Sequence, residues 1–257
     1  MIEQFSSELW RARLEREPIE PLTERAPDIT VEDAYRISLE ILHRRLSVGE
    51  TVVGKKIGLT SKAVQEMLKV DEPDFGFLTD VMVCESGTTV EMARELIQPK
   101  AEGEIAFKLK HDLAGPGVTG ADVLGATEGL AACFEIVDSR ILDWRIRIQD
   151  TVADNASCGF VVLGDRWVAP DRINLPACKM VVKNNGREVA TGVGSAALGS
   201  PANCVAWLAN TLTELGSSLK AGEIIISGSL IPLLPIHPGD RLLVQVEGIG
   251  RAEVGFD

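Results

Sequence analysis

Two glutamates one residue apart, Glu102 and Glu104, are the residues whose types and spacing most directly suggest chemistry. The stretch that follows, Ile105 to Leu109, alternates apolar with small or polar residues, as a strand does. Side chains at i and i+2 of a strand leave by the same face, so we expect both glutamates on one face with Ala106. Two adjacent carboxylates repel each other unless a positive charge lies between them. Mg²⁺ and Mn²⁺, which prefer oxygen ligands, are the natural candidates for that charge.

A third carboxylate strengthens this interpretation, because an acidic pair by itself is more often a solvated strand edge. Glu135 lies inside the apolar run 132–137, and a lone carboxylate seldom stays buried without a partner. Three carboxylates from two strands could form an octahedral metal site with positions left open for water or substrate. The alternative for Glu135 is a buried salt bridge with Arg140 or Lys100.

Lys55 and Lys56 are adjacent on a predicted strand, so they point to opposite faces and at most one can enter a site. Judged from the local sequence alone, two exposed lysines are the simpler interpretation. Asp74 falls in a turn-rich loop, 71–76, between a proline and a phenylalanine. Desolvation there could raise its pKa, or the side chain could simply cap a turn.

Two further loops contain clusters of small and polar residues. In segment 151–159, backbone N–H groups and Ser157 could hold a carboxylate just before a strand. Segment 192–200 is glycine-rich and precedes a helix, but it lacks the lysine of a phosphate-binding loop. No dinucleotide-binding fingerprint appears in the sequence.

Composition excludes several classes of function. The chain has 257 residues, 45% hydrophobic and 25% charged, as in an ordinary globular protein, and its net charge of −12 argues against nucleic acid and anionic membrane partners. Its five cysteines are widely spaced without a C-x-x-C pair, which suits reduced thiols. Its three histidines lie in motif-free contexts, which disfavours a Cys–His mechanism. With no signal peptide or transmembrane run indicated, we expect a cytoplasmic protein.

The elements that must position these residues form a helical arm, residues 1–50, and a β-rich catalytic body, residues 51–257, in a single compact unit. In the arm we expect a capping box at Thr30 and Asp33. In the body, short connections favour an α+β fold around a mixed, largely antiparallel sheet. The predicted helices cover 3–17, 31–48, 60–68, 119–131 and 201–215, with Tyr35, Leu39, Leu42 and Leu46 on one face of the second. The predicted strands cover 51–59, 132–137, 158–164, 178–183, 187–191, 223–229, 241–247 and 251–256.

Taken together, the motifs resemble those of a known family. They are Gly54-x-Lys56-Ile57-Gly58-Leu59-Thr60, Pro73-Asp74-Phe75-Gly76, Glu102-x-Glu104, Glu135 with Val137-Asp138-Ser139-Arg140, and Val152-Ala153-Asp154-Asn155-Ala156-Ser157. In this order and spacing they are similar to the 2-oxopent-4-enoate (2-hydroxypenta-2,4-dienoate) hydratases, in the hydratase/decarboxylase branch of the fumarylacetoacetate hydrolase superfamily. The resemblance covers nearly the whole chain and implies a distorted β-roll surrounded by helices.

The resemblance also implies a role for each matching residue. Glu102, Glu104 and Glu135 match the ligands of Mg²⁺ or Mn²⁺, and Lys56 and Asp74 match catalytic residues beside the substrate. The substrate-binding positions are Ser157 and Leu59.

The activity implied is metal-dependent addition of water to 2-hydroxypenta-2,4-dienoate in aromatic catabolism, by a homo-oligomer. The sister activity, 4-oxalocrotonate decarboxylase, is the nearest alternative. A non-catalytic subunit in complex with that decarboxylase is another, and the intact site residues speak against it. A hydrolase that cleaves a C–C bond is more distant, since no His-Glu arrangement supplies a base for water.

Overall fold

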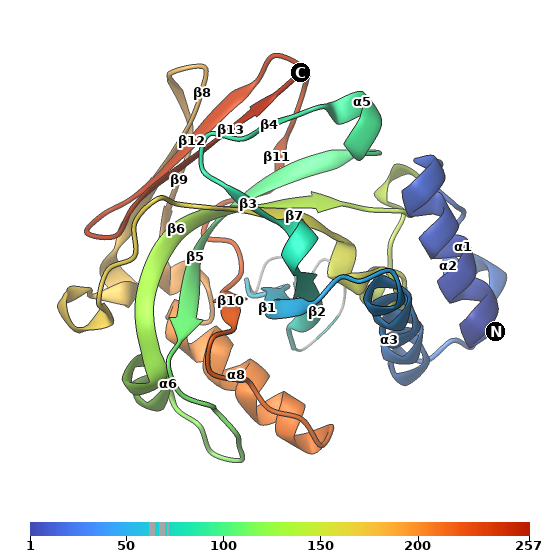
Figure 1. The fold of residues 1–257 in the computed structure, drawn as a ribbon, viewed down its shortest axis with the longest axis horizontal. Coiled ribbons are helices and arrows are strands. Elements are labelled where there is room, and N and C mark those ends of the chain that lie inside the picture. The colour runs from blue at the N-terminus through green and yellow to red at the C-terminus, as the bar shows by residue number, and fades with distance from the viewer. Residues whose placement is uncertain (62–64, 67–69, 71) are drawn as a thin grey trace.

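The computed structural model describes residues 1–61, 65–66, 70 and 72–257. Figure 1 shows the first three helices gathered at one side of the molecule and a small sheet with the C-terminus near the opposite side, joined by long curved strands. The helices are α1 (Ile2–Glu15), α2 (Leu22–Arg25), α3 (Val31–Ser47), α5 (Met92–Glu95), α6 (Gly120–Ala126), α7 (Ile148–Ala153) and α8 (Pro201–Glu214). The strands are β1 (Val52–Gly58), β2 (Asp74–Thr79), β3 (Val83–Glu85), β4 (Thr89–Val90), β5 (Pro99–Leu109), β6 (Thr127–Asp138), β7 (Cys158–Leu163), β8 (Lys179–Asn184), β9 (Arg187–Val193), β10 (Ile224–Ile226), β11 (Leu234–Pro235), β12 (Arg241–Val246) and β13 (Gly250–Phe256).

Two sheets make up the body, and most of their strand pairs are antiparallel. The larger sheet has eight strands, in the order β2-β1-β10-β5-β6-β7-β3 with β11 paired to β5, and the smaller has five, in the order β4-β13-β12-β8-β9. Only β1/β10, β3/β7 and β13/β4 are parallel among the described strand pairs. The expected α+β class with a mixed, largely antiparallel sheet is therefore confirmed.

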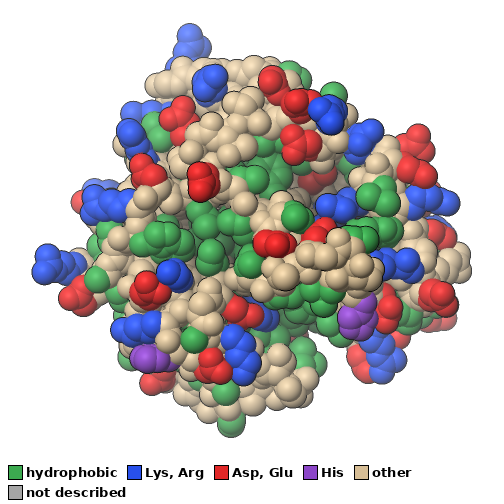
Figure 2. Space-filling model, viewed as in Figure 1, with side chains coloured by type: hydrophobic (Ala, Val, Ile, Leu, Met, Phe, Trp, Pro, Cys, Tyr) green, Lys and Arg blue, Asp and Glu red, His purple; other side chains and the backbone are tan. Residues whose placement is uncertain are grey.

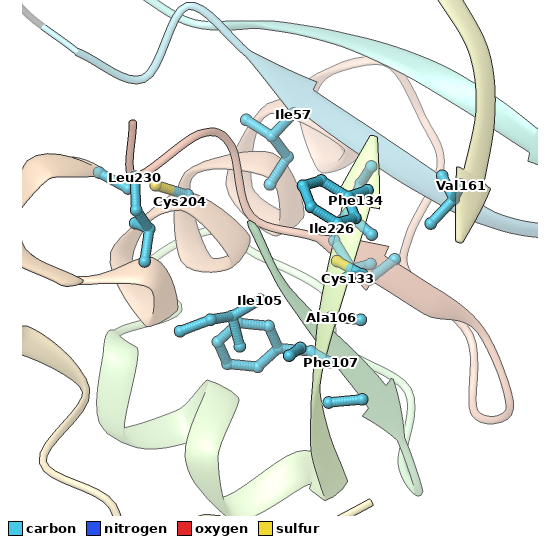
Figure 3. Close-up of a cluster of buried hydrophobic side chains, with 14 of the residues drawn as sticks. Ile57, Ile105, Ala106, Phe107, Cys133, Phe134, Val161, Cys204, Ile226 and Leu230 are labelled. Carbon is cyan, nitrogen blue, oxygen red and sulfur yellow. The ribbon is translucent and has the colours of Figure 1, made fainter. Parts of the chain in front are cut away.

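Strands β5 and β6 form the centre of the larger sheet and pair along nearly their whole length, from Pro99 opposite Asp138 to Leu109 opposite Thr127. One face of this pair packs into the main hydrophobic core, together with α8 and the smaller sheet. Figure 3 shows part of that core, with Ile105, Phe107 and Phe134 among its buried side chains. This burial fixes the register, since a slip by one residue would exchange the two faces.

A second, smaller core holds the N-terminal helices against α7. It is built from side chains of α1 and α3 together with Ile141, Val152 and Ala153 of the body. The predicted capping box is present, since Thr30 and Asp33 each accept a hydrogen bond from the other's backbone N–H. The arm helices are therefore anchored on the segment that leads into the 151–159 loop.

The buried face of α3 differs from the expected one. Leu39 and Leu46 are each 41% exposed, while Ala34 and Ser38 are at most 2% exposed. The buried side chains recur at the i, i+3, i+4, i+7 spacing of an amphipathic helix and pack toward α1 and α7; they are Ala34, Ile37, Ser38 and Ile41. The predicted face through Tyr35, Leu39, Leu42 and Leu46 is therefore buried only in part: Leu42 is buried and Tyr35 half-buried, while Leu39 and Leu46 are exposed.

Three further expectations need correction. The helix predicted over 119–131 ends at Ala126, because residues from Thr127 onward pair with β5 and their burial on both faces hides the strand period. Asp74 lies at the start of β2 rather than in a loop, because it pairs with Gly58 of β1. Ser200 precedes α8 as expected, but its side chain makes no capping hydrogen bond. The helix predicted over 60–68 falls largely outside the described residues.

Candidate active site

The three glutamates converge on one face of the β5–β6 pair. Glu102 lies directly opposite Glu135 in the register, and Glu104 follows two residues along the same strand. One carboxylate oxygen from each lies within 4.8 Å of the others. Glu104 and Glu135 are fully buried, while Glu102 is partly exposed. The arrangement expected from the i, i+2 spacing is therefore present.

The electrostatics of these three carboxylates indicate a missing positive charge. Burial, and then the charge of Glu135, raises the pKa of Glu102 to about 8, and the same causes raise the pKa of Glu104. Oε2 of Glu104 accepts a hydrogen bond of 2.7 Å from the N–H of Gly228, but Oε1 has no partner among the described residues. Neither oxygen of Glu135 accepts a hydrogen bond from the described residues, although Oε1 lies 3.3 Å from Nζ of Lys56. Free, buried, converging oxygen atoms are the donor set that a hard divalent cation requires.

Lys56 is the cation nearest to the three glutamates. Its Nζ lies 3.3 Å from Oε1 of Glu135 and donates a 2.9 Å hydrogen bond to the carbonyl oxygen of Ala156. Burial lowers the pKa of Lys56, but the charges of Glu135 and Asp74 raise it by more, so the ammonium group stays charged. Lys55, on the other face, pairs with Glu223 at 2.6 Å. One lysine enters the site, as expected, but the interpretation of two exposed lysines is wrong.

Asp74 approaches the same site from β2. It is 2% exposed, and its Oδ1 has no hydrogen-bond partner among the described residues. Burial raises its pKa, while the nearby charge of Lys56 opposes that shift. The opposite residue on β1 must be glycine, because a Cβ atom at Gly58 would lie 2.2 Å from Oδ1 of Asp74 and 3.1 Å from Nζ of Lys56. The desolvated interpretation of Asp74 is therefore the correct one.

The loop before β7 closes the site through strained backbone. The backbone has positive φ values of 55°, 50° and 54° at Asn155, Ala156 and Ser157, and residues other than glycine rarely adopt such values. Each such residue costs on the order of 1 kcal/mol and persists only where its surroundings enforce it. The side chain of Asn155 exchanges hydrogen bonds of 2.7 and 3.0 Å with the backbone of Phe77, so it pairs with β2 as a strand would.

Arg140 holds the other side of this loop. Its guanidinium group binds the carboxylate of Asp154 and the carbonyl oxygens of Asp138, Asp154 and Cys158. Its backbone N–H donates a further 2.9 Å bond to Asp154. Burial raises the pKa of Asp154 to about 6, although Arg140 opposes that shift. We call Asp138, Arg140 and Asp154 the arginine cluster, and Glu102, Glu104, Glu135, Asp74 and Lys56 the acidic cluster.

The two remaining sequence-predicted positions are next in sequence to residues that contact the acidic cluster. Ser157 follows Ala156, the partner of Lys56, and its Oγ lies 3.2 Å from the hydroxyl of Thr151. Leu59 follows Gly58 directly, and its carbonyl oxygen accepts a 2.8 Å bond from Gln65.

The salt bridge proposed as an alternative for Glu135 involves neither of the expected partners. Arg140 pairs with Asp154, and Lys100 lies over the ring of Trp144 at 4.2 Å. The contribution of Asn155 was not anticipated from the sequence. Its place in an Asp-Asn-Ala-Ser segment, among residues that tolerate left-handed backbone, is the only local signal.

Comparison with known proteins agrees with this geometry. Residues 48–256 match the family model described as fumarylacetoacetate (FAA) hydrolase C-terminal. The chain therefore belongs to the fumarylacetoacetate hydrolase family, as the sequence motifs predicted.

Within that family, the chain is most usefully compared with three proteins. It is 62% identical over 216 residues to a 2-hydroxypent-2,4-dienoate hydratase of Pseudomonas putida, covering 84% of this chain and 97% of the relative. It is 56% identical over 256 residues to a 2-hydroxyhexa-2,4-dienoate hydratase of Comamonas testosteroni, covering 99% and 97%. The structure of 4-oxalocrotonate decarboxylase from Pseudomonas putida G7, complexed with magnesium and adipate, is 34% identical and superposes with a TM-score of 0.96, covering 100% and 97%.

Proposed function

We propose that this protein is a metal-dependent hydratase that converts 2-hydroxypenta-2,4-dienoate to 4-hydroxy-2-oxopentanoate in aromatic meta-cleavage catabolism. The observation that carries the proposal is the acidic cluster: three buried carboxylates with unused oxygen atoms, beside a buried lysine and a buried aspartic acid. The identities of 62% and 56% to hydratases, against 34% to the decarboxylase, support hydration over decarboxylation.

Glu102, Glu104 and Glu135 would hold Mg²⁺ or Mn²⁺, the hard cations that match an all-oxygen donor set. Bound there, the ion would supply Lewis-acid stabilisation of negative charge on the substrate's carboxylate and C2 oxygen. Glu102 is the most exposed of the three ligands, so a small anion would reach the ion from its side.

The chain's own residues would orient the dienoate and move its protons. Lys56, fixed between Glu135 and the carbonyl of Ala156, keeps a positive charge where the substrate's oxygens would lie. Asp74, whose pKa is raised by burial, is suited to carry a proton for transfer to C5 of the diene. Water then adds at C4. Ser157 and Leu59 would contact the substrate.

The decarboxylase activity is the second candidate, because the solved decarboxylase superposes over the whole chain. Loss of CO₂ needs stabilisation of an enolate, whereas hydration also needs an acid near C5 and delivery of water. The presence of the buried acid Asp74 favours hydration.

We further propose a cytoplasmic homo-oligomer, with residues 1–50 as its helical arm and 51–257 as its catalytic body. A complex with a paralogous decarboxylase is a possible extension of this assembly. Five free cysteines suit a reducing compartment. No helix among the described residues is long and apolar enough to cross a membrane. On the face shown in Figure 2, acidic and basic side chains are interspersed around a hydrophobic centre, without a basic region for nucleic acid. A particle of only 27.7 kDa in light scattering at micromolar concentration would reject the oligomer.

The decisive experiment is product identification. Pure protein with Mg²⁺ and 2-hydroxypenta-2,4-dienoate should yield 4-hydroxy-2-oxopentanoate, and the same protein should release little CO₂ from 4-oxalocrotonate. Chelator treatment should remove most of the activity, and Mg²⁺ or Mn²⁺ should restore it. Rapid CO₂ release would favour the decarboxylase, and full activity in metal-stripped protein would contradict the metal site.

A further inference from the structure

Tyr35 occupies a position that no other described side chain shares. It is the one partly buried residue, within the described part of the chain, that packs against both the main core and the small core of the N-terminal helices. It is also the single tyrosine of the protein. Tyr35 is therefore one of the contacts that join the arm to the body, and the one among the described side chains that links the two cores directly.

From α3, the Tyr35 ring reaches the strand that carries Asp74. It stacks on the ring of Phe75, with centroids 4.6 Å apart and planes at 21°. Phe75 in turn meets Phe77 edge to face, at 6.2 Å and 80°. Figure 1 shows α3 beside β2, and the two elements are in contact. Because side chains alternate along a strand, Phe75 faces the arm while Asp74 faces the site.

The strand β2 lies at an edge of the larger sheet, where β1 is its only neighbour among the described strands, so contacts from outside the sheet matter more to its position. Asp74 is the first residue of β2 and is held on one side by its pairing with Gly58. On the other side, the stacked ring of Phe75 and the pairing of Asn155 with Phe77 hold the strand. An aromatic stack is worth about 0.5–1.5 kcal/mol beyond its buried area, enough to select one strand position.

The charge of Asp74 also acts on the hydroxyl of Tyr35. Burial, and then the negative charge of Asp74, raises the pKa of Tyr35, while the backbone N–H of Phe75 opposes that shift. The phenol therefore stays neutral and adds no charge beside Asp74. Tyr35 therefore acts on Asp74 through packing and not through a charge of its own.

We propose that Tyr35 is a positioning residue for Asp74, through which the N-terminal helices set the orientation of the catalytic acid. The proposal rests on the proposed hydratase function and on the role of Asp74 within it. A displacement of about 1 Å in a catalytic group can cost as much as 100-fold in rate, so a modest loss of strand position has a measurable effect.

The test compares single and double variants in the full-length, metal-loaded protein. Tyr35→Leu should lower kcat for 2-hydroxypenta-2,4-dienoate roughly 10- to 100-fold, with KM and Mn²⁺ affinity nearly unchanged. Tyr35→Phe, which keeps the stacked ring, should retain kcat within a few-fold. In an Asp74→Asn background, Tyr35→Leu should add almost nothing, because both changes act on the same proton transfer. Phe75→Leu removes the stack from the strand side and gives the same pattern if Tyr35→Leu does not fold.

The matched control is Ile37→Val, which loosens the fully buried face of α3 without touching β2. It should lower stability and leave kcat unchanged. Wild-type kcat in Tyr35→Leu, or full additivity with Asp74→Asn, would overturn the positioning role. Normal hydration by Asp74→Asn alone would instead overturn the role of Asp74, so the two failures are distinguishable.

Discussion

The acidic cluster and the arginine cluster are both buried charge groups built on β6 and its neighbours, but they use their hydrogen-bonding atoms differently. In the arginine cluster, the carboxylates of Asp138 and Asp154 accept hydrogen bonds from backbone N–H groups or from Arg140. In the acidic cluster, Oδ1 of Asp74, Oε1 of Glu104 and both oxygens of Glu135 accept no hydrogen bond within the described part of the chain, and Oε1 of Glu135 has an ion pair with Lys56.

This difference separates structural charge from functional charge. A satisfied cluster stabilises one conformation of the surrounding loops, and removing a member leaves its partner unpaired. An unsatisfied cluster costs folding free energy and is retained where a ligand completes it. Variants of the two clusters should therefore differ in kind: one set should lose stability and the other should lose activity.

The largest effect is expected for Asp74→Asn, which keeps the shape of the side chain but removes its transferable proton. Hydration should fall by about 10²- to 10⁴-fold, the range for loss of a general acid or base, with metal affinity nearly unchanged. Steady-state kinetics and Mn²⁺ titration measure both quantities. Asp80→Asn, on an exposed residue just after β2, is the control. Normal hydration by Asp74→Asn would place this residue with the structural group.

Asp154→Asn should mainly destabilise the protein. It leaves the guanidinium group of Arg140 buried beside an amide, and breaking a buried pair typically costs about 3–5 kcal/mol. Urea unfolding should show this loss both with and without metal. Asp112→Asn breaks an exposed, solvent-screened pair with Lys220 and should cost far less stability. Equal losses of stability for the two variants would contradict the structural role of the arginine cluster.

Glu104→Gln should have the opposite profile. Removal of one ligand charge should reduce turnover by roughly 10²-fold or more. The metal-free protein should be at least as stable as wild type, because a buried carboxylate without a full set of partners has been neutralised. Thermal unfolding with chelator and kinetics with saturating Mg²⁺ test the two parts. Glu128→Gln, on the exposed side of β6, controls for charge alone. An unfolded variant that kept its specific activity would make Glu104 structural.

The smallest expected effects are changes of metal affinity and of protein stability with pH. Because the pKa of Glu102 is raised to about 8, a proton competes with the cation below that pH. Affinity for Mn²⁺ should therefore increase as the pH rises towards 8, by at most about tenfold per pH unit for one proton. The metal-free protein should change in the other direction. Its folded state binds this proton more tightly than the unfolded chain, so stability falls as the pH rises from about 4.5 to 8. Calorimetry at several pH values would detect both trends, and a pH-independent affinity would contradict the shift.

The parts of the site that the sequence revealed are those governed by local geometry. The i, i+2 rule placed Glu102 and Glu104 on one face, and the same alternation separated Lys55 from Lys56. Pairings across long sequence separations could not be read in this way. The bond between Lys56 and the carbonyl of Ala156 joins residues 100 positions apart and depends on how β1 meets the loop before β7.

The boundaries of helices and strands could not be predicted correctly for a related reason. The start of β6 at Thr127 is decided by its long pairing with β5, and an apolar stretch buried on both faces carries no period that would separate strand from helix. The buried face of α3 follows Ala34, Ile37 and Ile41, whose helical spacing in the sequence competes with a second apolar stripe that includes Leu39 and Leu46.

The placement of the acidic cluster on its strands also sets how the site should move over time. Glu102, Glu104 and Glu135 lie in the middle of the long ladder at the centre of the sheet, where amide protons exchange with solvent only when much of the body unfolds. Asp74 is the first residue of β2, an edge strand, whose amide protons exchange through small and frequent local unfolding. We therefore expect the metal ligands to behave as a stationary frame on the timescale of turnover, while substrate entry and product release displace the acid. Such an enzyme would keep its ion bound through many catalytic cycles, and Asp74 would return to its catalytic position in each cycle.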